Sequence, residues 1–261
     1  MKGGFHYFMK LKLKRLLTLS LCFIFFSSQL IFPAQASGDL SLDCDLWNYT
    51  MIFGEDVPPK PDIIIIYLHG DNSRGTTTEH LERLATIEHP LKYAREDLLP
   101  LPDNVLLICP QAEFDGQFRT EQENLEGFIL FVSLMYPDAK IILGGASHGS
   151  LAAYKIAAFQ NEDVDGYIFV SGIRPPESEK LPTLKNCMVV FGDEWWLSKR
   201  GDYSNLFYQE DITDGKFEKE SLIWEEETNN LYIRGPWTHH NSPSVFMEDF
   251  FWEWVSNVSN E

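Results

Sequence analysis

The run Asp62-Ile-Ile-Ile-Ile-Tyr-Leu68 constrains the fold most strongly, because its apolar residues leave no polar face. A strand of this kind is buried on both sides, which is typical of the centre of a parallel sheet. Similar short apolar runs follow at residues 104–109, 140–143, 167–170 and 187–191. The segments between several of them have helical spacing. Buried strands that alternate with helices predict an α/β fold with a mostly parallel sheet covered by helices on both faces.

The remaining segments complete this prediction. In parallel sheets of this class, ligands bind at the carboxyl ends of the strands, so residues that directly follow a strand deserve most weight. The other expected elements are an early strand at 46–53, helical segments at 78–99 with a break or kink at Pro90, a helix at 121–136, a helix after Gly149, a final strand pair at 221–224 and 230–234, and a closing amphipathic helix at 244–255.

The first 36 residues have the pattern of a secretory signal peptide. Five basic residues and no acidic one precede the apolar run 16–32, and Pro33-Ala-Gln-Ala36 then offers a small-x-small cleavage site. The alternative is an uncleaved membrane anchor, although the run is slightly short for a span. We therefore expect a signal peptide at 1–36, a single domain at 37–261, and a secreted or periplasmic protein without stable membrane association after cleavage.

Composition narrows the choice of partners. Residues 37–261 hold 16 of the 21 basic residues and all 39 acidic residues, a net charge of −23 that repels nucleic acid and anionic lipid. Three cysteines remain in this part, and no pair of them has metal-ligand spacing. Cys109 and Cys187 lie in apolar runs and are expected to be buried thiols, whereas the pairing of Cys44 stays open. The oligomeric state is also left open.

The stretch Gly145-Ala-Ser-His-Gly149 matches the G-x-S-x-G nucleophile elbow. It follows an expected strand and precedes an expected helix, which is the context that this motif requires. Side chains at positions 145 and 149 would collide when the helix folds back along its own strand, so glycine is needed at both. The turn would expose the hydroxyl of Ser147 and aim the backbone N–H of His148 at a developing oxyanion.

A second oxyanion donor is expected from the turn after the strongest strand. Leu68-His69-Gly70-Asp71 ends that strand, and the backbone N–H of Asp71 can serve as the donor. The alternative is an ordinary turn at the end of a strand. His69 precedes the serine in the chain, so a structural role suits it better than the role of a base.

A nucleophilic serine needs a base, and the base needs an orienting carboxylate. Asp193 directly follows an expected strand and is the preferred acid, with Glu194 and Asp202 as competitors. The base is expected near the C-terminus, where His240 is slightly preferred over His239. Both histidines could instead be solvent-exposed loop residues.

With these residues identified, the chain resembles the α/β-hydrolase superfamily over about residues 62–255. Leu68-His-Gly70, Pro110-Gln-Ala112 and the stretch 145–149 are similar to the phospholipase/carboxylesterase branch of small, lidless esterases and acyl-thioesterases. The resemblance implies attack by Ser147 on a carbonyl carbon, proton relay by His240, orientation of the histidine by Asp193, and an oxyanion hole made by Asp71 and His148. It implies no metal and no cofactor.

Two departures from the branch bear on the acid and the base. The branch usually has Gly-x-x-Asp at the acid, whereas Gly192 directly precedes Asp193, and it usually has glycine before the histidine, where this chain has Thr238 or His239. No long insertion separates the strands at 167 and 187, so no large lid is expected. The predicted function is hydrolysis of small carboxylic esters by a secreted serine hydrolase. The alternatives are a thioesterase or peptidase of the same fold, and a non-catalytic binding protein.

Overall fold

The computed structural model describes residues 40–43, 48–53, 60–70, 74–84, 90–112, 118, 121–159, 161–171, 184–192, 221–235 and 242–259. The expected signal peptide at 1–36 lies outside these residues, as does Cys44. The described helices and strands all belong to one compact unit of the chain.

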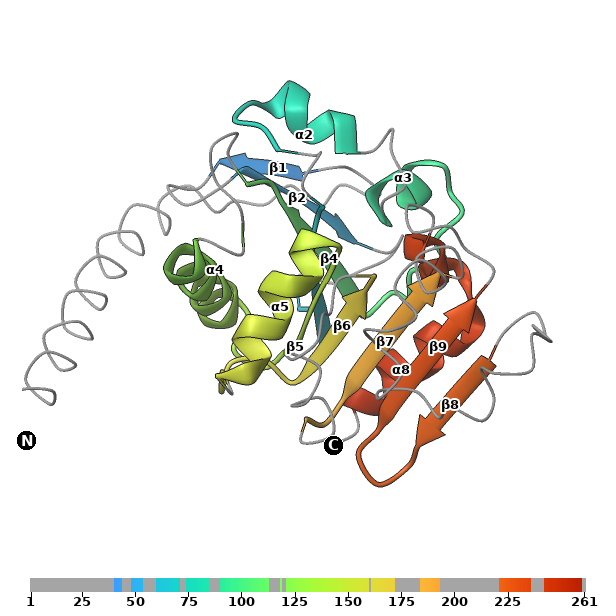
Figure 1. Ribbon diagram of the computed structural model, residues 1–261. Coiled ribbons are helices and arrows are strands. Elements are labelled where there is room, and N and C mark those ends of the chain that lie inside the picture. Colours follow the sequence, from blue (N-terminus) through green and yellow to red (C-terminus); the bar gives the residue numbers. More distant parts are fainter. Residues whose placement is uncertain are drawn as a thin grey trace, which may run out of the picture. The chain divides into compact units, whose positions relative to one another are not determined.

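The described strands form a nine-stranded sheet in the order β1-β2-β4-β3-β5-β6-β7-β9-β8 (Figure 1). Strands β3, β4, β5, β6, β7 and β9 are parallel neighbours, and β1, β2 and β8 are antiparallel to their neighbours. The sheet is therefore mostly parallel, as the buried apolar runs predict. The bounds are β1 Leu40–Asp43, β2 Asn48–Phe53, β3 Ile63–Leu68, β4 Val105–Pro110, β5 Lys140–Ala146, β6 Gly166–Val170, β7 Cys187–Gly192, β8 Ser221–Glu225 and β9 Asn230–Gly235.

Helices cover both faces of the sheet (Figure 1). On one face, α4 (Gln122–Met135) and α5 (His148–Ala158) pack on alternate residues of β3 such as Ile64 and Ile66. On the other face, α2 (Thr78–Leu84), α3 (Pro90–Arg95), the 3₁₀ helix η3 (Ser242–Met247) and α8 (Asp249–Ser259) contribute to a second core with Ile63 and Ile65. Successive β3 side chains enter different apolar cores, which explains why the strand is apolar on both faces.

Several details differ from the sequence prediction or extend it. The expected helix at 244–255 is wrong over its first part, where η3 is a 3₁₀ helix and α8 begins only at Asp249. Strand β1 was not expected at all. Within 78–99 the described helices are α2 and α3, and Pro90 opens α3 at the position where a missing N–H does no harm.

The two described cysteines are buried and free, which confirms the expectation for Cys109 and Cys187. Burial raises the pKa of the Cys187 thiol well above its usual range. A thiol held protonated in this way is a poor nucleophile, so its role is packing.

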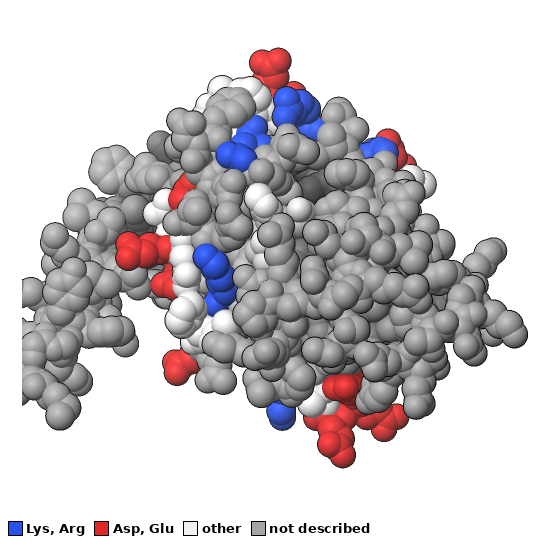
Figure 2. Space-filling view, viewed as in Figure 1, with Lys and Arg blue, Asp and Glu red and all other residues white. Residues whose placement is uncertain are grey.

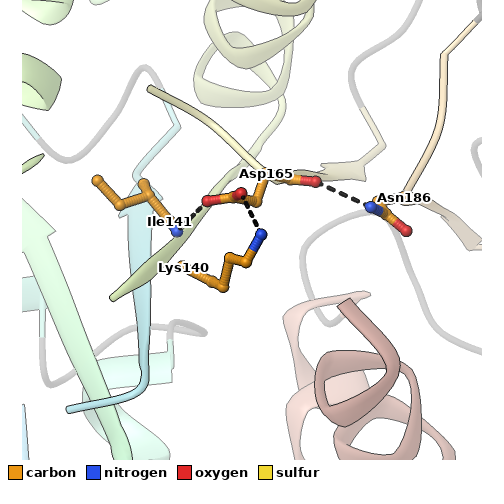
Figure 3. Close-up of polar contacts among 4 residues, drawn as sticks. All are labelled: Lys140, Ile141, Asp165 and Asn186. Carbon is orange, nitrogen blue, oxygen red and sulfur yellow. Dashed lines mark hydrogen bonds and ion pairs between the residues drawn. The ribbon is translucent and has the colours of Figure 1, made fainter. Parts of the chain in front are cut away.

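A polar network ties the amino ends of β5, β6 and β7 together (Figure 3). Lys140 Nζ lies 3.0 Å from Asp165 Oδ1, while the N–H of Ile141 donates to Asp165 Oδ2 at 2.8 Å. The Nδ2 group of Asn186 donates to the Asp165 carbonyl at 3.1 Å, and the Nδ2 group of Asn229 donates to Asn186 Oδ1 at 2.8 Å. These contacts lie at the edge of the sheet opposite to the carboxyl ends of its parallel strands.

Where Figure 2 shows described residues, Lys and Arg side chains lie among those of Asp and Glu. One acidic group lies at the turn between β8 and β9, where Glu226 and Glu227 are exposed. In the described part of the chain, no helix is both long and apolar enough to cross a membrane.

Candidate active site

Parallel strands bring residues from distant parts of the chain to the carboxyl edge of the sheet. Because β3, β4, β5, β6, β7 and β9 run in parallel, the residues that follow them emerge at this one edge. Among the described residues, these are His69 and Gly70 after β3, Gln111 after β4, Ser147 after β5 and Ser171 after β6.

Ser147 has the backbone of a sharp turn between strand and helix. It lies between the last residue of β5 and the first of α5, with φ 52° and ψ −114°. This combination is sparsely populated for any residue with a Cβ atom, so the turn is strained. The surrounding hydrogen bonds hold it: the N–H of Ser147 donates to the Val170 carbonyl at 2.8 Å, and its carbonyl accepts from the N–H of Leu151 at 3.1 Å.

The two glycines of the motif are required by close backbone contacts. A Cβ atom on Gly145 would lie 2.6 Å from the carbonyl carbon of Gly149 and 2.7 Å from the Leu68 oxygen. A Cβ atom on Gly149 would overlap the Leu68 oxygen and lie 2.8 Å from the His69 oxygen. The obstacles are backbone atoms, which cannot rotate away. The steric argument made from the sequence is therefore confirmed: the start of α5 passes directly over the end of β3.

The end of β3 also approaches the serine itself. A Cβ atom placed on Gly70 would lie 3.6 Å from the Cβ of Ser147, in ordinary van der Waals contact. The residue after Gly70 is Asp71, the expected oxyanion donor, which lies outside the described residues. The structure thus brings the chain to Ser147 at the residue that precedes the expected donor.

His148, the other expected donor, opens α5 and is partly exposed. Backbone N–H groups in the first turn of a helix point along the helix axis and favour an anion. The N–H of His148 is therefore chemically suited to a negatively charged oxygen bound close to Ser147.

His69 is held in a structural environment, as its position before the serine suggested. Its ring is 2% exposed, and its Nε2 accepts a hydrogen bond from the N–H of Ala112 at 3.0 Å. Its Nδ1 lies 2.6 Å from the Gly70 carbonyl oxygen. With both ring nitrogens bound to backbone groups, this histidine is not placed to take a proton from Ser147.

The expected acid and base lie outside the described residues: Asp193 with its competitors Glu194 and Asp202, and His240 with its competitor His239. The strands that lead to them are described. Gly192 ends β7 immediately before Asp193, Gly235 ends β9 five residues before His240, and these two glycines pair in register.

Ser171 was missed by the sequence analysis. It directly follows β6, is 2% exposed, and has φ 51°. Its N–H donates to the Val190 carbonyl at 2.9 Å, which continues the ladder between β6 and β7 to the carboxyl edge. A serine followed by glycine directly after a buried run was the available signal.

The described residues contain no group of three or more His, Cys, Asp and Glu side chains that could hold a metal ion. At the carboxyl edge they do contain the hydroxyl of Ser147 on a strained turn, close to the first amide of α5 and to the end of β3.

Comparison with known proteins gives a likeness in structure alone. No family model matches the sequence, and no curated protein matches it. A thermostable esterase has a TM-score of 0.54 and 15% identity, over 85% of this chain and 63% of that chain, so this chain spans less than two thirds of that enzyme. The S-formylglutathione hydrolase of Staphylococcus aureus has a TM-score of 0.53 and 14% identity over 86% of this chain and 99% of its own.

An acetyl xylan esterase from Aspergillus awamori has a TM-score of 0.51 and 12% identity, over 85% of this chain and 99% of its own. At such identities the likeness concerns the fold. The strand order, the parallel core, the helices on both faces and the strand-to-helix turn at Ser147 agree with it. The chain therefore has the α/β-hydrolase fold.

Proposed function

We propose that this protein is a secreted serine hydrolase that cleaves small carboxylic esters through an acyl-enzyme intermediate. The observation that carries the proposal is the backbone of Ser147, with φ 52° between β5 and α5 and an obligatory glycine on each side. A serine in this conformation is strained, and strained residues cluster at active sites, where the surrounding structure holds them in place. The position at the carboxyl edge of a parallel sheet is where this class of fold binds its ligands.

In the proposed reaction, Ser147 Oγ forms a bond to the ester carbonyl carbon while its proton passes to the imidazole of His240. The carbon–oxygen bond to the alcohol then breaks, and the imidazolium returns the proton to the departing alcohol. A water molecule then attacks the acyl carbon and gives its proton to the imidazole. The bond between this carbon and Ser147 Oγ breaks, the carboxylic acid leaves, and the proton returns to Ser147. Asp193 orients the imidazole, with Glu194 or Asp202 as the alternative acid and His239 as the alternative base.

The negative charge on the carbonyl oxygen is proposed to be bound by the backbone N–H groups of His148 and Asp71. The start of α5 and the short distance from a Cβ atom placed on Gly70 to the Cβ of Ser147, 3.6 Å, support this arrangement, because both donors would then approach the serine from adjacent elements. Donors of this type are fixed before the reaction begins, so they lose no free energy by reorganising.

The first 36 residues support the secreted location, through their basic start, apolar run and Ala-Gln-Ala36 site. The net negative charge of the rest of the chain favours an uncharged small-molecule substrate over nucleic acid.

Labelling with a fluorophosphonate probe tests the proposal directly. We expect the purified protein to be labelled, Ser147→Ala to be unlabelled, and Ser150→Ala to be labelled like the wild type. Ser150 is a matched control because it is a buried serine three residues further along the chain, in the helix that follows the motif. A folded wild-type protein that resists the probe would contradict the proposal and favour a binding function.

Substrate preference is tested in the same preparation. We expect hydrolysis of p-nitrophenyl acetate or butyrate to exceed that of acyl thioesters and of peptide amides. Faster turnover of a thioester or an amide would identify the protein as a thioesterase or a peptidase. Ser147 would remain the proposed nucleophile.

A further inference from the structure

One peptide unit at the end of β6 connects the turn at Ser147 to β7. The N–H of Ser147 donates to the Val170 carbonyl at 2.8 Å. The N–H of Ser171 donates to the Val190 carbonyl at 2.9 Å. The Val170 carbonyl and the Ser171 N–H belong to the same planar peptide, which points the two groups in opposite directions. Because β6 lies between β5 and β7, this peptide accepts from the turn on one side and donates to β7 on the other.

Ser171 has a backbone conformation that residues with a side chain rarely adopt. Its φ is 51°, in the left-handed region, although its side chain is 2% exposed and glycine would fit there without strain. The register pairs Ala146 with Val170, so Ser147 and Ser171 are the next residues of the two strands. Ser147 has φ 52°. Two strained serines therefore end neighbouring strands at the carboxyl edge.

The conformation of Ser171 bears directly on the bond that holds Ser147. The angle φ is the rotation about the N–Cα bond of Ser171, so it sets the preceding peptide relative to the chain that follows. A residue that resists positive φ relieves its strain by rotating this peptide, and the rotation turns the Val170 carbonyl away from the Ser147 N–H. The turn at Ser147 is itself strained, and strain persists only where the surrounding structure holds it.

We propose that Ser171 is a positioning residue for Ser147 and that it acts through its left-handed backbone, not through its hydroxyl. Its effect on the reaction rate rests on the proposed function, whereas its effect on the Ser147 turn does not. A displacement of about 1 Å in a reacting group can cost about 10²-fold in rate. The orientation of the last β6 peptide is therefore expected to matter for catalysis although Ser171 takes no part in proton transfer.

Two substitutions separate the backbone conformation of Ser171 from its hydroxyl. Ser171→Gly removes the hydroxyl and favours positive φ, whereas Ser171→Thr keeps a hydroxyl and disfavours positive φ, because Thr is branched at Cβ. With p-nitrophenyl butyrate we expect Ser171→Gly to keep kcat within about twofold of the wild type and Ser171→Thr to lose about tenfold or more. Ser171→Cys adds volume at this buried position without a branch, so its kcat should stay above that of Ser171→Thr.

Three further measurements separate positioning from a general loss of structure. In Ser171→Thr, KM should stay within about threefold of the wild-type value, because substrate binding is intact. The rate constant for labelling of Ser147 by a fluorophosphonate should fall in parallel with kcat. Hydrogen exchange of the Ser147 amide should be about tenfold faster than in the wild type and in Ser171→Gly. The amide of Ile168, in the middle of β6, should change less.

Asp97 provides the matched control for the backbone effect. It also has positive φ, 57°, and is an exposed residue between α3 and the start of β4, at the edge of the sheet opposite to Ser147. Asp97→Gly and Asp97→Thr change the same backbone preference, so they should shift the thermal unfolding temperature in opposite directions without changing kcat.

The outcomes distinguish this inference from the proposed function. A wild-type protein without hydrolytic activity would contradict the proposed function, and exchange of the Ser147 amide would still decide the role of Ser171. In an active wild type, a folded Ser171→Thr variant within twofold of its kcat, or a larger loss in Ser171→Gly than in Ser171→Thr, would overturn only the role of Ser171. If Ser171→Thr does not fold, Ser171→Gly decides: a loss of kcat above about tenfold, or faster exchange of the Ser147 amide, would overturn the proposal.

Discussion

Gly192 at the end of β7 pairs in register with Gly235 at the end of β9. The pair is the last of a parallel ladder that starts at Met188 and Leu231, so both strands reach the carboxyl edge together. The segments that carry the proposed acid and base thus begin side by side. β6 alone separates β7 from β5, the strand that ends at Ser147.

From this arrangement we expect His240 to act as the base. His240→Ala should lower kcat for an ester by about 10³-fold or more, because the serine then has no proton acceptor. His239→Ala is the matched control and should retain most of the activity. Initial rates with p-nitrophenyl butyrate measure both variants. Loss of activity in His239→Ala alone would show that His239 is the base.

The same reasoning gives a test of the acid. Asp193→Asn should lower kcat by about 10⁴-fold, since an amide favours the wrong histidine tautomer. Glu194→Gln and Asp202→Asn should leave kcat close to the wild-type value. A variant of Glu194 or Asp202 with the larger loss would replace Asp193 as the orienting carboxylate.

The fold could be predicted from the sequence where the signal was local. The apolar run at 62–68 identified a central strand, and Gly145 and Gly149 identified the sharp turn, because each depends on residues adjacent in the chain. Strand β1 and the 3₁₀ helix η3 were not predicted. The pairing of β1 with β2 and the contacts of η3 with α3 and β7 come from distant parts of the chain.

For the site, too, local features were predicted and long-range contacts were not. The turn at Ser147 was predicted from its motif. The hydrogen bond from the Ala112 N–H to His69 was not predicted, since it joins residues 43 positions apart. Ser171 was overlooked because a serine after a strand has no spacing pattern of its own. Asp193 and His240 stay predictions, supported by the paired strand ends that precede them.

The close approach of α5 to β3 predicts different costs for two glycine substitutions. Gly149→Ala should lower the free energy of unfolding by about 1–3 kcal/mol or more, because the new methyl group overlaps the Leu68 carbonyl. In Gly70→Ala the nearest atoms would be 3.6 and 3.7 Å away, so stability should stay the same or rise by up to about 1 kcal/mol. Urea unfolding monitored by tryptophan fluorescence measures both. Equal losses of stability in the two variants would mean that the start of α5 is not tightly packed against the end of β3.

The strain at Ser147 predicts that the side chain needed for activity lowers the stability of the protein at this position. Ser147→Gly and Ser147→Ala should both abolish hydrolysis, but the glycine variant should be more stable by about 1 kcal/mol, because glycine tolerates φ 52°. Ser150, within α5, is the control. There the order should reverse, with alanine more stable than glycine by about 1 kcal/mol. Thermal unfolding of the four variants gives the comparison. If the alanine variant is the more stable one at both positions, the turn at Ser147 is unstrained.

The network at the opposite edge of the sheet predicts that the two members of one ion pair are not equivalent (Figure 3). The side chains of Lys140 and Asp165 are 39% and 31% exposed, so their mutual attraction is largely screened by water. Lys140→Met should therefore change the free energy of unfolding by less than about 1 kcal/mol. Asp165→Ala should cost about 1–3 kcal/mol, because the N–H of Ile141 loses the carboxylate oxygen that accepts from it at 2.8 Å. Asp165→Asn keeps an oxygen for this bond and should fall between the two. Urea unfolding at neutral pH decides the order, and a larger loss in Lys140→Met than in Asp165→Ala would show that the charge pair, and not the backbone hydrogen bond, stabilises this edge.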